Sequence, residues 1–224
     1  MIKKCKQCGG EFNATHNEQK YCSTSCASSM RKSLIYGIGI NDYPYPIKVK
    51  DKHLNFYKEW RSMFYRTIKK YTKNHEFAYD GVYVCEEWKS LSKFKEWYDE
   101  HYIEGNVLDK DICSNGERCY SPQNCAFVPK EINNLLTKPK YQRSKINLPL
   151  GVKRHSKSII RSYYACAQYK DKEIMSKPFP TPEEAHLAYI EIKEKIIKEQ
   201  AQHYYDIGKI EKRVYDALMN YKIE

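Results

Sequence analysis

Apolar residues in the middle of the chain fall into two stripes at helical spacing. The first lies within residues 54–72, and the second begins at Trp88 and continues on a segment that starts near Ser90. Side chains three or four positions apart share one face of a helix, so we predict two helices here. Such stripes belong far more often to a core than to a ligand site. The stripe residues are Phe56, Tyr57, Trp60, Met63, Phe64 and Tyr71, and then Trp88, Leu91, Phe94, Trp97 and Tyr98.

Shorter apolar runs follow and predict strand, loop, strand and helix. Residues 107–112 and 126–128 fit short strands, and residues 114–116 (Ser-Asn-Gly) fit a turn between them. Pro129 suits the first turn of a helix, because the N–H that proline lacks has no helical partner there. We therefore expect a helix from Pro129 to about residue 136.

After residue 150 the pattern changes to strands and then back to helices. The dipeptide Lys170-Asp171 fits a tight turn between two of the strands. Thr181 as the N-cap, followed by Pro182 and two glutamates, marks the start of a helix. The predicted strands are residues 151–154, 159–169 and 172–179, and the last predicted helix covers about residues 207–221.

We expect an α+β protein with three folded parts. A cysteine-rich module of residues 1–33 is followed by a block of residues 34–136, in which the strand–loop–strand–helix core covers about residues 105–136. A basic, proline-containing linker of residues 137–147 separates this block from the last part, residues 148–224.

Charge and composition narrow the class of protein. The chain has 224 residues, a formal net charge of +11 and a pI near 9.1, which favours a polyanionic partner such as nucleic acid. No run approaches the ~18 apolar residues that a membrane helix needs. No apolar segment follows the basic N-terminus, as it would in a secretory signal. We therefore expect a cytoplasmic protein with reduced cysteines and no membrane partner.

Four cysteines crowd the N-terminal module at the spacing of a zinc site. Cys5-x2-Cys8 and Cys22-x3-Cys26 are two chelating pairs, separated by a loop of 13 residues. Two such pairs can close a tetrahedral Zn²⁺ site. The alternatives are reduced cysteines without a metal, or a site in which His16 replaces one thiolate. A segment this short and polar is not expected to fold without the metal, so we assign the zinc a structural role.

Asp109 on a predicted strand, Asn124 after the loop and Asn133 on the following helix have the layout of a second metal site. A strand carboxylate and a helix carboxamide can hold one hard divalent cation such as Mg²⁺ through oxygen. Such a cation stabilises the charge that builds on a phosphodiester during cleavage. The spacing alone also fits a simpler alternative, in which these residues serve only in turns and helix caps.

Several runs in this region carry a family resemblance. They are Leu108-Asp109-Lys110-Asp111-Ile112, the run from Tyr120 to Pro129, and Ile132-Asn133, with Trp60-Arg61-x-Met63 and the run from Cys85 through Trp97 upstream. Together they resemble the HNH nuclease family in its phage-encoded, homing-endonuclease branch. The resemblance implies a ββα-metal fold in which Asp109 and Asn133 bind Mg²⁺ and Asn124 pins the loop. It also implies a phage protein that acts in the cytoplasm of a bacterial host.

Lys110 departs from that family's pattern. The family places its general-base histidine directly after the strand aspartate, whereas a lysine is protonated near pH 7 and is a poor base. Lys110 can still act as an electrostatic clamp on the scissile phosphate. The base would then come from elsewhere, and the candidates are His101, His75 and Tyr120.

The C-terminal part carries a second resemblance. The motifs are Gly151-Val152, Tyr164-Ala165 and Phe179-x-Thr181-x-Glu183-Glu184-Ala185-x-x-Ala188-Tyr189. They resemble the apetala/ethylene-response-factor type of DNA-binding domain. This resemblance implies a three-stranded antiparallel sheet packed on one helix, with the sheet in the major groove of DNA.

The charge of the C-terminal part agrees with a DNA-binding role. Residues 146–180 hold seven lysines and arginines against two acids, and a basic β-ribbon fits the major groove. The alternative is a solvated basic sheet face without a partner. The predicted DNA contacts are Arg143 in the linker and Lys153, Arg154, Lys157, Arg161, Tyr163, Lys170 and Lys172.

These observations favour a site-specific endonuclease of homing type that hydrolyses double-stranded DNA. One centre in a monomer cuts one strand, so we expect a monomeric nicking enzyme that takes no small-molecule substrate. A non-catalytic DNA-binding regulator with a degenerate HNH fold is the alternative that Lys110 favours. An RNA-binding zinc protein is less favoured, because the sequence lacks the paired aromatic platform of single-strand readers.

Overall fold

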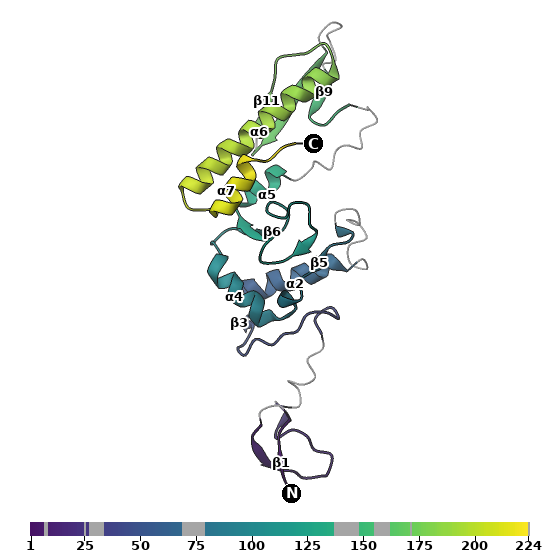
Figure 1. Cartoon of the computed structure of the whole chain (residues 1–224), viewed down its shortest axis with the longest axis vertical. Coiled ribbons are helices and arrows are strands. Elements are labelled where there is room, and N and C mark those ends of the chain that lie inside the picture. The colour runs from purple at the N-terminus through teal and green to yellow at the C-terminus, as the bar shows by residue number, and fades with distance from the viewer. Residues whose placement is uncertain are drawn as a thin grey trace. The chain divides into compact units, whose positions relative to one another are not determined.

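The computed structural model describes residues 1–6, 9–24, 26, 34–68, 79–136, 148–154, 162–170 and 172–223 (Figure 1). Within these residues the fold mixes helices with small sheets, which confirms the predicted α+β class. No helix in the described part of the chain is long and apolar enough to cross a membrane. Several predicted features lie outside the described residues, namely Cys8, Tyr71, His75, the linker of residues 137–147 with Arg143, and Lys157 and Arg161.

The chain divides into two compact units. Unit 1 is Met1–Glu100 with Cys119–Ser121, and unit 2 is His101–Arg118 with Pro122–Glu224. The predicted block of residues 34–136 is therefore shared between the two units.

Unit 1 consists of short paired strands and two longer helices. The pairs β1–β2 and β3–β4 are antiparallel, and β5–β7 is parallel. Its elements are β1 (Ile2–Lys4), β2 (Glu11–Asn13), β3 (Lys48–Val49), β4 (Lys52–His53), α2 (Asn55–Thr67), β5 (Tyr83–Val84), the 3-10 helix η2 (Glu87–Lys89), α4 (Leu91–His101, whose last residue belongs to unit 2) and β7 (Cys119–Tyr120).

The two predicted apolar stripes form the core of unit 1. α2 and α4 occupy the predicted segments and turn their apolar faces inward. Trp60 Nε1 donates a 2.7 Å hydrogen bond to the carbonyl of Trp88, which joins α2 to η2 and satisfies a buried indole N–H. The residues with no exposed surface are Trp60, Met63 and Phe64 from the first stripe and Trp88, Leu91 and Phe94 from the second.

Unit 2 begins with the predicted strand–loop–strand–helix and ends with a sheet and two helices. β6 pairs antiparallel with β8, and a second sheet has the strand order β11–β10–β9, all antiparallel. The elements are β6 (Val107–Asp109), β8 (Ala126–Val128), α5 (Lys130–Leu136), β9 (Val152–Arg154), β10 (Tyr163–Tyr169), β11 (Lys172–Met175), α6 (Pro182–Asp206) and α7 (Lys212–Met219).

The capping residues of the sequence predicted the start of α6 correctly, whereas two other predicted element boundaries differ from the structure. The Thr181 hydroxyl accepts a hydrogen bond from the Glu184 N–H at 3.3 Å, and Pro182 is the first helical residue, as predicted. The predicted third strand ends early, and Phe179 forms only an isolated bridge with Tyr163. The last helix starts later than predicted, after Gly208, whose φ of +67° interrupts helical geometry.

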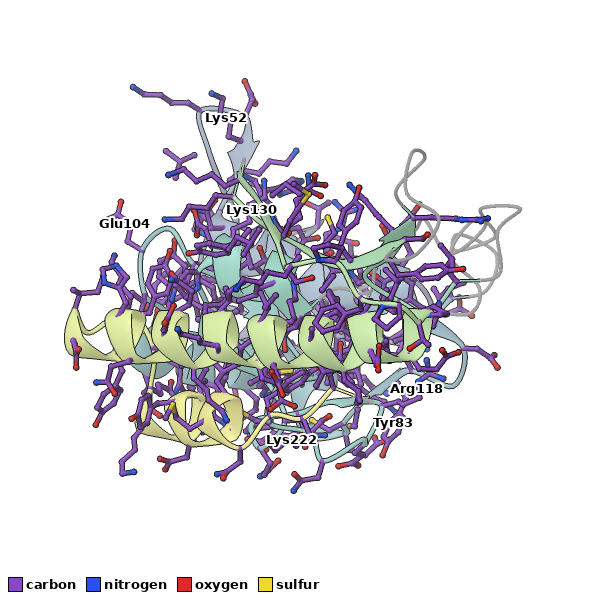
Figure 2. The ribbon with its side chains drawn as sticks, turned by 90° about the horizontal axis from the view of Figure 1, so that it is seen from above. Lys52, Tyr83, Glu104, Arg118, Lys130 and Lys222 are labelled. Atoms are coloured by element: carbon purple, nitrogen blue, oxygen red, sulfur yellow. The ribbon has the colours of Figure 1, made fainter. Side chains whose placement is uncertain are left out.

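One hydrophobic core runs through unit 2. It contains Ala126 and Val128 from β8 and Ala165 and Ala167 from β10, all at most 1% exposed. α6 and α7 lie side by side (Figure 2) and contribute residues to the same cluster. The β6–β8–α5 segment and the C-terminal sheet are therefore parts of one packed body. The remaining fully described core residues are Ile132, Leu135, Tyr189, Ile196, Ile197, Ala201, Ile210, Val214 and Leu218.

Candidate functional site

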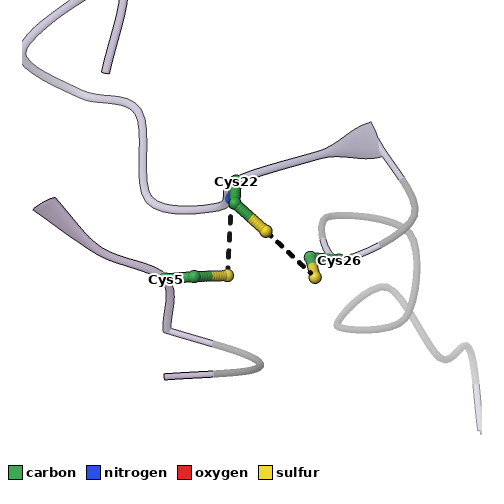
Figure 3. A group of neighbouring side chains, drawn as sticks. All are labelled: Cys5, Cys22 and Cys26. Carbon is green, nitrogen blue, oxygen red and sulfur yellow. Dashed lines mark hydrogen bonds between the residues drawn. The ribbon is translucent and has the colours of Figure 1, made fainter. Parts of the chain in front are cut away.

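Three of the four predicted zinc ligands lie together in the N-terminal module (Figure 3). The sulfur atoms of Cys5, Cys22 and Cys26 all lie within 4.8 Å of one another. The Cys22 and Cys26 sulfurs are 3.5 Å apart, and the Cys22 N–H donates to the Cys5 sulfur at 3.4 Å. Within the part of the chain that the structure describes, His16 does not belong to this group.

The cysteine geometry fits a metal such as zinc. Four sulfurs at about 2.3 Å from a tetrahedral Zn²⁺ lie roughly 3.8 Å from one another, close to the Cys22–Cys26 separation. The N–H of Cys22 that is directed at the Cys5 sulfur ties the two ligand segments together. Among the described residues 1–26, Cys5 is the only one that is buried, so apolar packing contributes little to the fold of this module.

An open basic groove lies in the same module, and the net charge of the sequence did not predict its position. Lys3 and Lys4 come from β1, Lys6 follows them, and Lys20 comes from the loop that precedes Cys22. Lysines gathered along one groove provide point charges for phosphate groups. The sequence signal was the cluster of lysines around the first cysteine, which the net charge alone did not assign to a surface. Other lining residues are His16, Asn17, Glu18, Gln19, Tyr21, Ser23 and Thr24.

Asp109 ends β6, opposite Ala126 of β8. Its Oδ1 accepts hydrogen bonds from the N–H groups of Asp111 at 2.8 Å and Ile112 at 2.9 Å. These bonds turn the chain and stop the strand, which is why the predicted strand of residues 107–112 is shorter. Burial raises the pKa of the Asp109 carboxyl, and the two N–H groups offset only part of this effect.

Lys110 is buried, with 6% of its surface exposed. Its ammonium group pairs with the carboxylate of Asp111, which is largely exposed. The residue that departs from the HNH pattern is therefore held in the turn that follows β6. This position suits a structural or electrostatic role better than that of a base.

Asn124 and Asn133 lie on the other parts of the strand–loop–strand–helix. Asn124 is buried, and its side-chain amide donates to the Glu117 carboxylate at 2.9 Å, which ties two points of the β6–β8 connection together. Asn133 is half-buried in the first turns of α5, and α5 contacts β6. The structure thus puts Asp109 and Asn133 on contacting elements, β6 and α5, and Asn124 in the connection between β6 and β8.

His101, a predicted base candidate, belongs to a charged network. Its Nδ1 lies 2.7 Å from Glu211 Oε1, and the other oxygen of Glu211 accepts a 2.6 Å hydrogen bond from Arg213 Nε. Burial opposes ionisation of Glu211, but Arg213 and His101 outweigh it and lower the pKa of this carboxyl. Sequence reasoning missed Glu211 and Arg213, because no local motif links them to His101.

Tyr120, another base candidate, accepts a hydrogen bond from Arg66 at 3.3 Å.

The register of the C-terminal sheet divides the predicted DNA contacts between its two faces. Opposed residues of an antiparallel pair share a face. Lys153 opposes Tyr164, and therefore lies on the face away from Ala165 and the core. Arg154 opposes Tyr163 and lies on the helix-facing side, although it is exposed.

The outward face of the sheet is mixed in charge. Lys153 pairs with Glu173 across the sheet, and Cys166 lies between them. Gln168 and Met175 are exposed on this face, and they were not among the predicted contacts. Of the other predicted contacts, Lys172 opposes Tyr169 on the helix side and Lys170 occupies the β10–β11 turn with a φ of +53°.

None of the family models, curated proteins or solved structures with which the chain was compared matches it. The HNH and apetala resemblances therefore rest on the motifs quoted above. The function has to be inferred from the local geometry of the described residues.

Proposed function

We propose that the protein is a metal-dependent, site-specific DNA endonuclease of homing type that nicks duplex DNA. The observation that carries this proposal is the β6–β8–α5 unit. Asp109 ends its first strand, Asn124 pins the connection between the strands, and Asn133 lies on the helix that packs on β6. This order of elements, with these residue types, agrees with the ββα-metal arrangement that the HNH resemblance implies.

Asp109 and Asn133 are the residues that would hold Mg²⁺. Both offer the oxygen ligands that this ion prefers. The two backbone N–H groups occupy Oδ1 of Asp109, so Oδ2 is the oxygen that a metal would take. Because burial raises the pKa of this carboxyl, a neighbouring cation would favour its ionised form. The bound ion would supply charge stabilisation to the phosphodiester at the reacting centre.

His101 is the proposed general base of this centre. The contact between its Nδ1 and the Glu211 carboxylate fixes the ring and favours the tautomer with hydrogen on Nδ1. The opposite nitrogen, Nε2, is then the atom that would accept a proton from water. Lys110, paired with Asp111, would act on the phosphate only as a positive charge.

Two surfaces support a DNA partner. The lysine groove of the N-terminal module and the exposed cations of the C-terminal sheet both suit phosphate contacts. The formal charge of +11 adds a long-range attraction to polyanions. We propose that zinc held by Cys5, Cys22, Cys26 and Cys8 maintains the module that carries the groove.

A DNA-binding regulator without catalytic activity is the second candidate. The observation that favours it is Lys110, which occupies the place of the family's base and is engaged with Asp111. A regulator would use the same basic surfaces and would keep the ββα unit only as a scaffold.

A nicking assay separates the two candidates. A supercoiled plasmid that carries DNA from the neighbourhood of the coding gene is incubated with and without Mg²⁺. Asp109→Asn keeps an oxygen acceptor for the two N–H groups but removes the charge, and Asn133→Ala removes the helix ligand. Asn134→Ala is the matched control, because Asn134 is the exposed neighbour on the same helix.

We expect magnesium-dependent nicking by the wild type and by the Asn134 variant. Loss of one metal ligand should lower the rate by at least ~100-fold in the other two variants. If the wild type binds this DNA tightly but does not nick it with any divalent cation, the endonuclease proposal is wrong and the regulator is the better description.

A further inference from the structure

A single arginine of the C-terminal helix holds the loop that carries Asn124. Arg213 Nη1 donates to the carbonyls of Pro122 at 3.0 Å and Gln123 at 3.1 Å, and Nη2 donates to the carbonyl of Cys125 at 2.7 Å. Three carbonyls around Asn124 thus converge on one guanidinium group.

The same guanidinium is fixed from its other side. Its Nε donates to Glu211 Oε2 at 2.6 Å, and Glu211 Oε1 lies 2.7 Å from His101 Nδ1. Four of the five N–H donors of Arg213 are therefore used, and the planar fork leaves little freedom to the group. The network joins the Asn124 loop to the proposed base through Arg213 and Glu211, and Glu211 lies 110 positions after His101 in the sequence.

This network differs from the other ion pairs of α7. Lys212, the neighbouring residue, pairs with Asp216 at 2.8 Å one turn along the same helix, and its side chain is 71% exposed. Such exposed pairs within a helix contribute little. Arg213 is about one-third exposed, and its partners are backbone carbonyls of another segment. Removing it leaves three carbonyls without this donor, including that of the buried Cys125.

We propose that Arg213 is a positioning residue of the nuclease centre. It sets the conformation of residues 122–125, and so the place of Asn124, and through Glu211 it sets the orientation of the His101 ring. This inference rests on the proposed endonuclease function. It makes strand cleavage depend on the C-terminal helix, while DNA affinity depends on other surfaces.

Two substitutions test the role. Arg213→Met removes all the donors, and Arg213→Lys keeps the charge but cannot reach three carbonyls and a carboxylate at once. Lys212→Met is the matched control, since it removes a cation and an ion pair from the same helix without touching the loop. For each variant we would measure the nicking rate at saturating protein, the dissociation constant for DNA, and the thermal midpoint.

A fourth readout does not depend on activity. Cys125 has no exposed surface, and its carbonyl is the shortest contact of Arg213 in the loop. Its rate of alkylation by N-ethylmaleimide, followed by peptide mass spectrometry, therefore reports opening of residues 122–125.

We expect both Arg213 variants to nick ~10–100-fold more slowly, because a small misplacement of catalytic groups can cost that much. Their DNA affinity should change less than about twofold, and Cys125 should be alkylated faster. Lys212→Met should match the wild type in all four measurements. Arg213→Lys keeps the positive charge, so a slow nicking rate in this variant would show that the hydrogen-bond geometry of Arg213 matters and not its charge alone.

The outcomes separate this inference from the function on which it rests. If the wild type nicks and a folded Arg213→Lys protein nicks at the same rate, the inference is wrong and the endonuclease stands. If the wild type never nicks, the endonuclease proposal fails and takes the catalytic role of Arg213 with it. Unchanged alkylation of Cys125 in a folded Arg213→Met protein would overturn the loop-holding role whatever the activity.

Discussion

Gly151, directly before β9, packs closely against Tyr189 of α6 and offers a quantitative test of the fold. Its φ is +74°, and a Cβ added there would lie 2.1–2.4 Å from ring atoms of Tyr189. Tyr189 is 5% exposed and belongs to the core of unit 2. The Gly151 carbonyl accepts a 2.7 Å hydrogen bond from the Cys166 N–H, so the backbone cannot move away without weakening the sheet.

The expected cost of Gly151→Ala has two parts. A side chain in the left-handed region costs about 1–2 kcal/mol. Forcing one methyl group into a packed ring contact costs typically 1–3 kcal/mol more. We therefore expect the free energy of unfolding to fall by about 3 kcal/mol, which for a chain of this size lowers the thermal midpoint by roughly 6–12 °C.

Gly208→Ala is the matched control for Gly151→Ala. Gly208 lies in the same unit with a φ of +67°, but an added Cβ would meet no atom within 4 Å. It should lose only the conformational part, about 1–2 kcal/mol. Urea unfolding followed by circular dichroism measures both variants. Equal losses would show that Tyr189 gives way, and would refute the tight packing of β9 on α6.

Three further predictions concern the sites. Chelation of the metal, or Cys26→Ser, should abolish the protection of backbone amides against hydrogen exchange in residues 1–26, while the unfolding of unit 2 stays unchanged. The reason is that a structural Zn²⁺ contributes on the order of 10 kcal/mol to the folding of such a module. Hydrogen exchange measures this protection, and protection that persists without the metal would contradict the prediction. Asp109→Asn should stabilise the metal-free protein at pH 7, since burial raises the pKa of this carboxyl above its ordinary 3.8 and its ionised form opposes folding. The difference should vanish as the pH falls below that ordinary value, and Mg²⁺ should raise the thermal midpoint of the wild type alone; an unaffected midpoint in the wild type would argue against the site. Replacing Lys3 and Lys6 by Gln should reduce the slope of log affinity for DNA against log salt concentration by about 2. The control Lys195→Gln on α6 should leave this slope unchanged. Identical slopes in all variants would show that the groove does not contact DNA.

Local signals in the sequence predicted most of the elements. The stripe that includes Trp60 and Phe64 encodes α2, because a helix needs only a continuous apolar face to pack. Thr181 and Pro182 predicted the start of α6 to the residue, because capping is a contact between neighbours in sequence. The same holds for three of the four cysteines, Cys5, Cys22 and Cys26, whose spacing predicted the observed sulfur cluster.

Contacts between distant segments were beyond the same reasoning. Nothing near Arg213 in the sequence indicates that its partners are the carbonyls of residues 122–125. The face of the sheet on which Lys153 lies was partly predictable. The alternation of Ala165, Cys166 and Ala167 along β10 indicates which face of the sheet packs on the core. The end of β6 was not predicted, since it depends on the Asp109 side chain turning back to its own backbone.

The shared core of unit 2 has a consequence for how a homing-type enzyme would select its cleavage position. A flexible linker after residue 136 would let the ββα unit cut at several distances from the bases that the sheet reads. Instead, Val128 of β8 and Ala167 of β10 are buried in one cluster with residues of α6 and α7. Relative movement of the sheet and the ββα unit would expose that apolar surface, at about 25 cal/mol for each Å². If the sheet reads DNA and the ββα unit nicks it, the cut therefore lies at one fixed offset from the recognised bases, and moving those bases moves the cut with them.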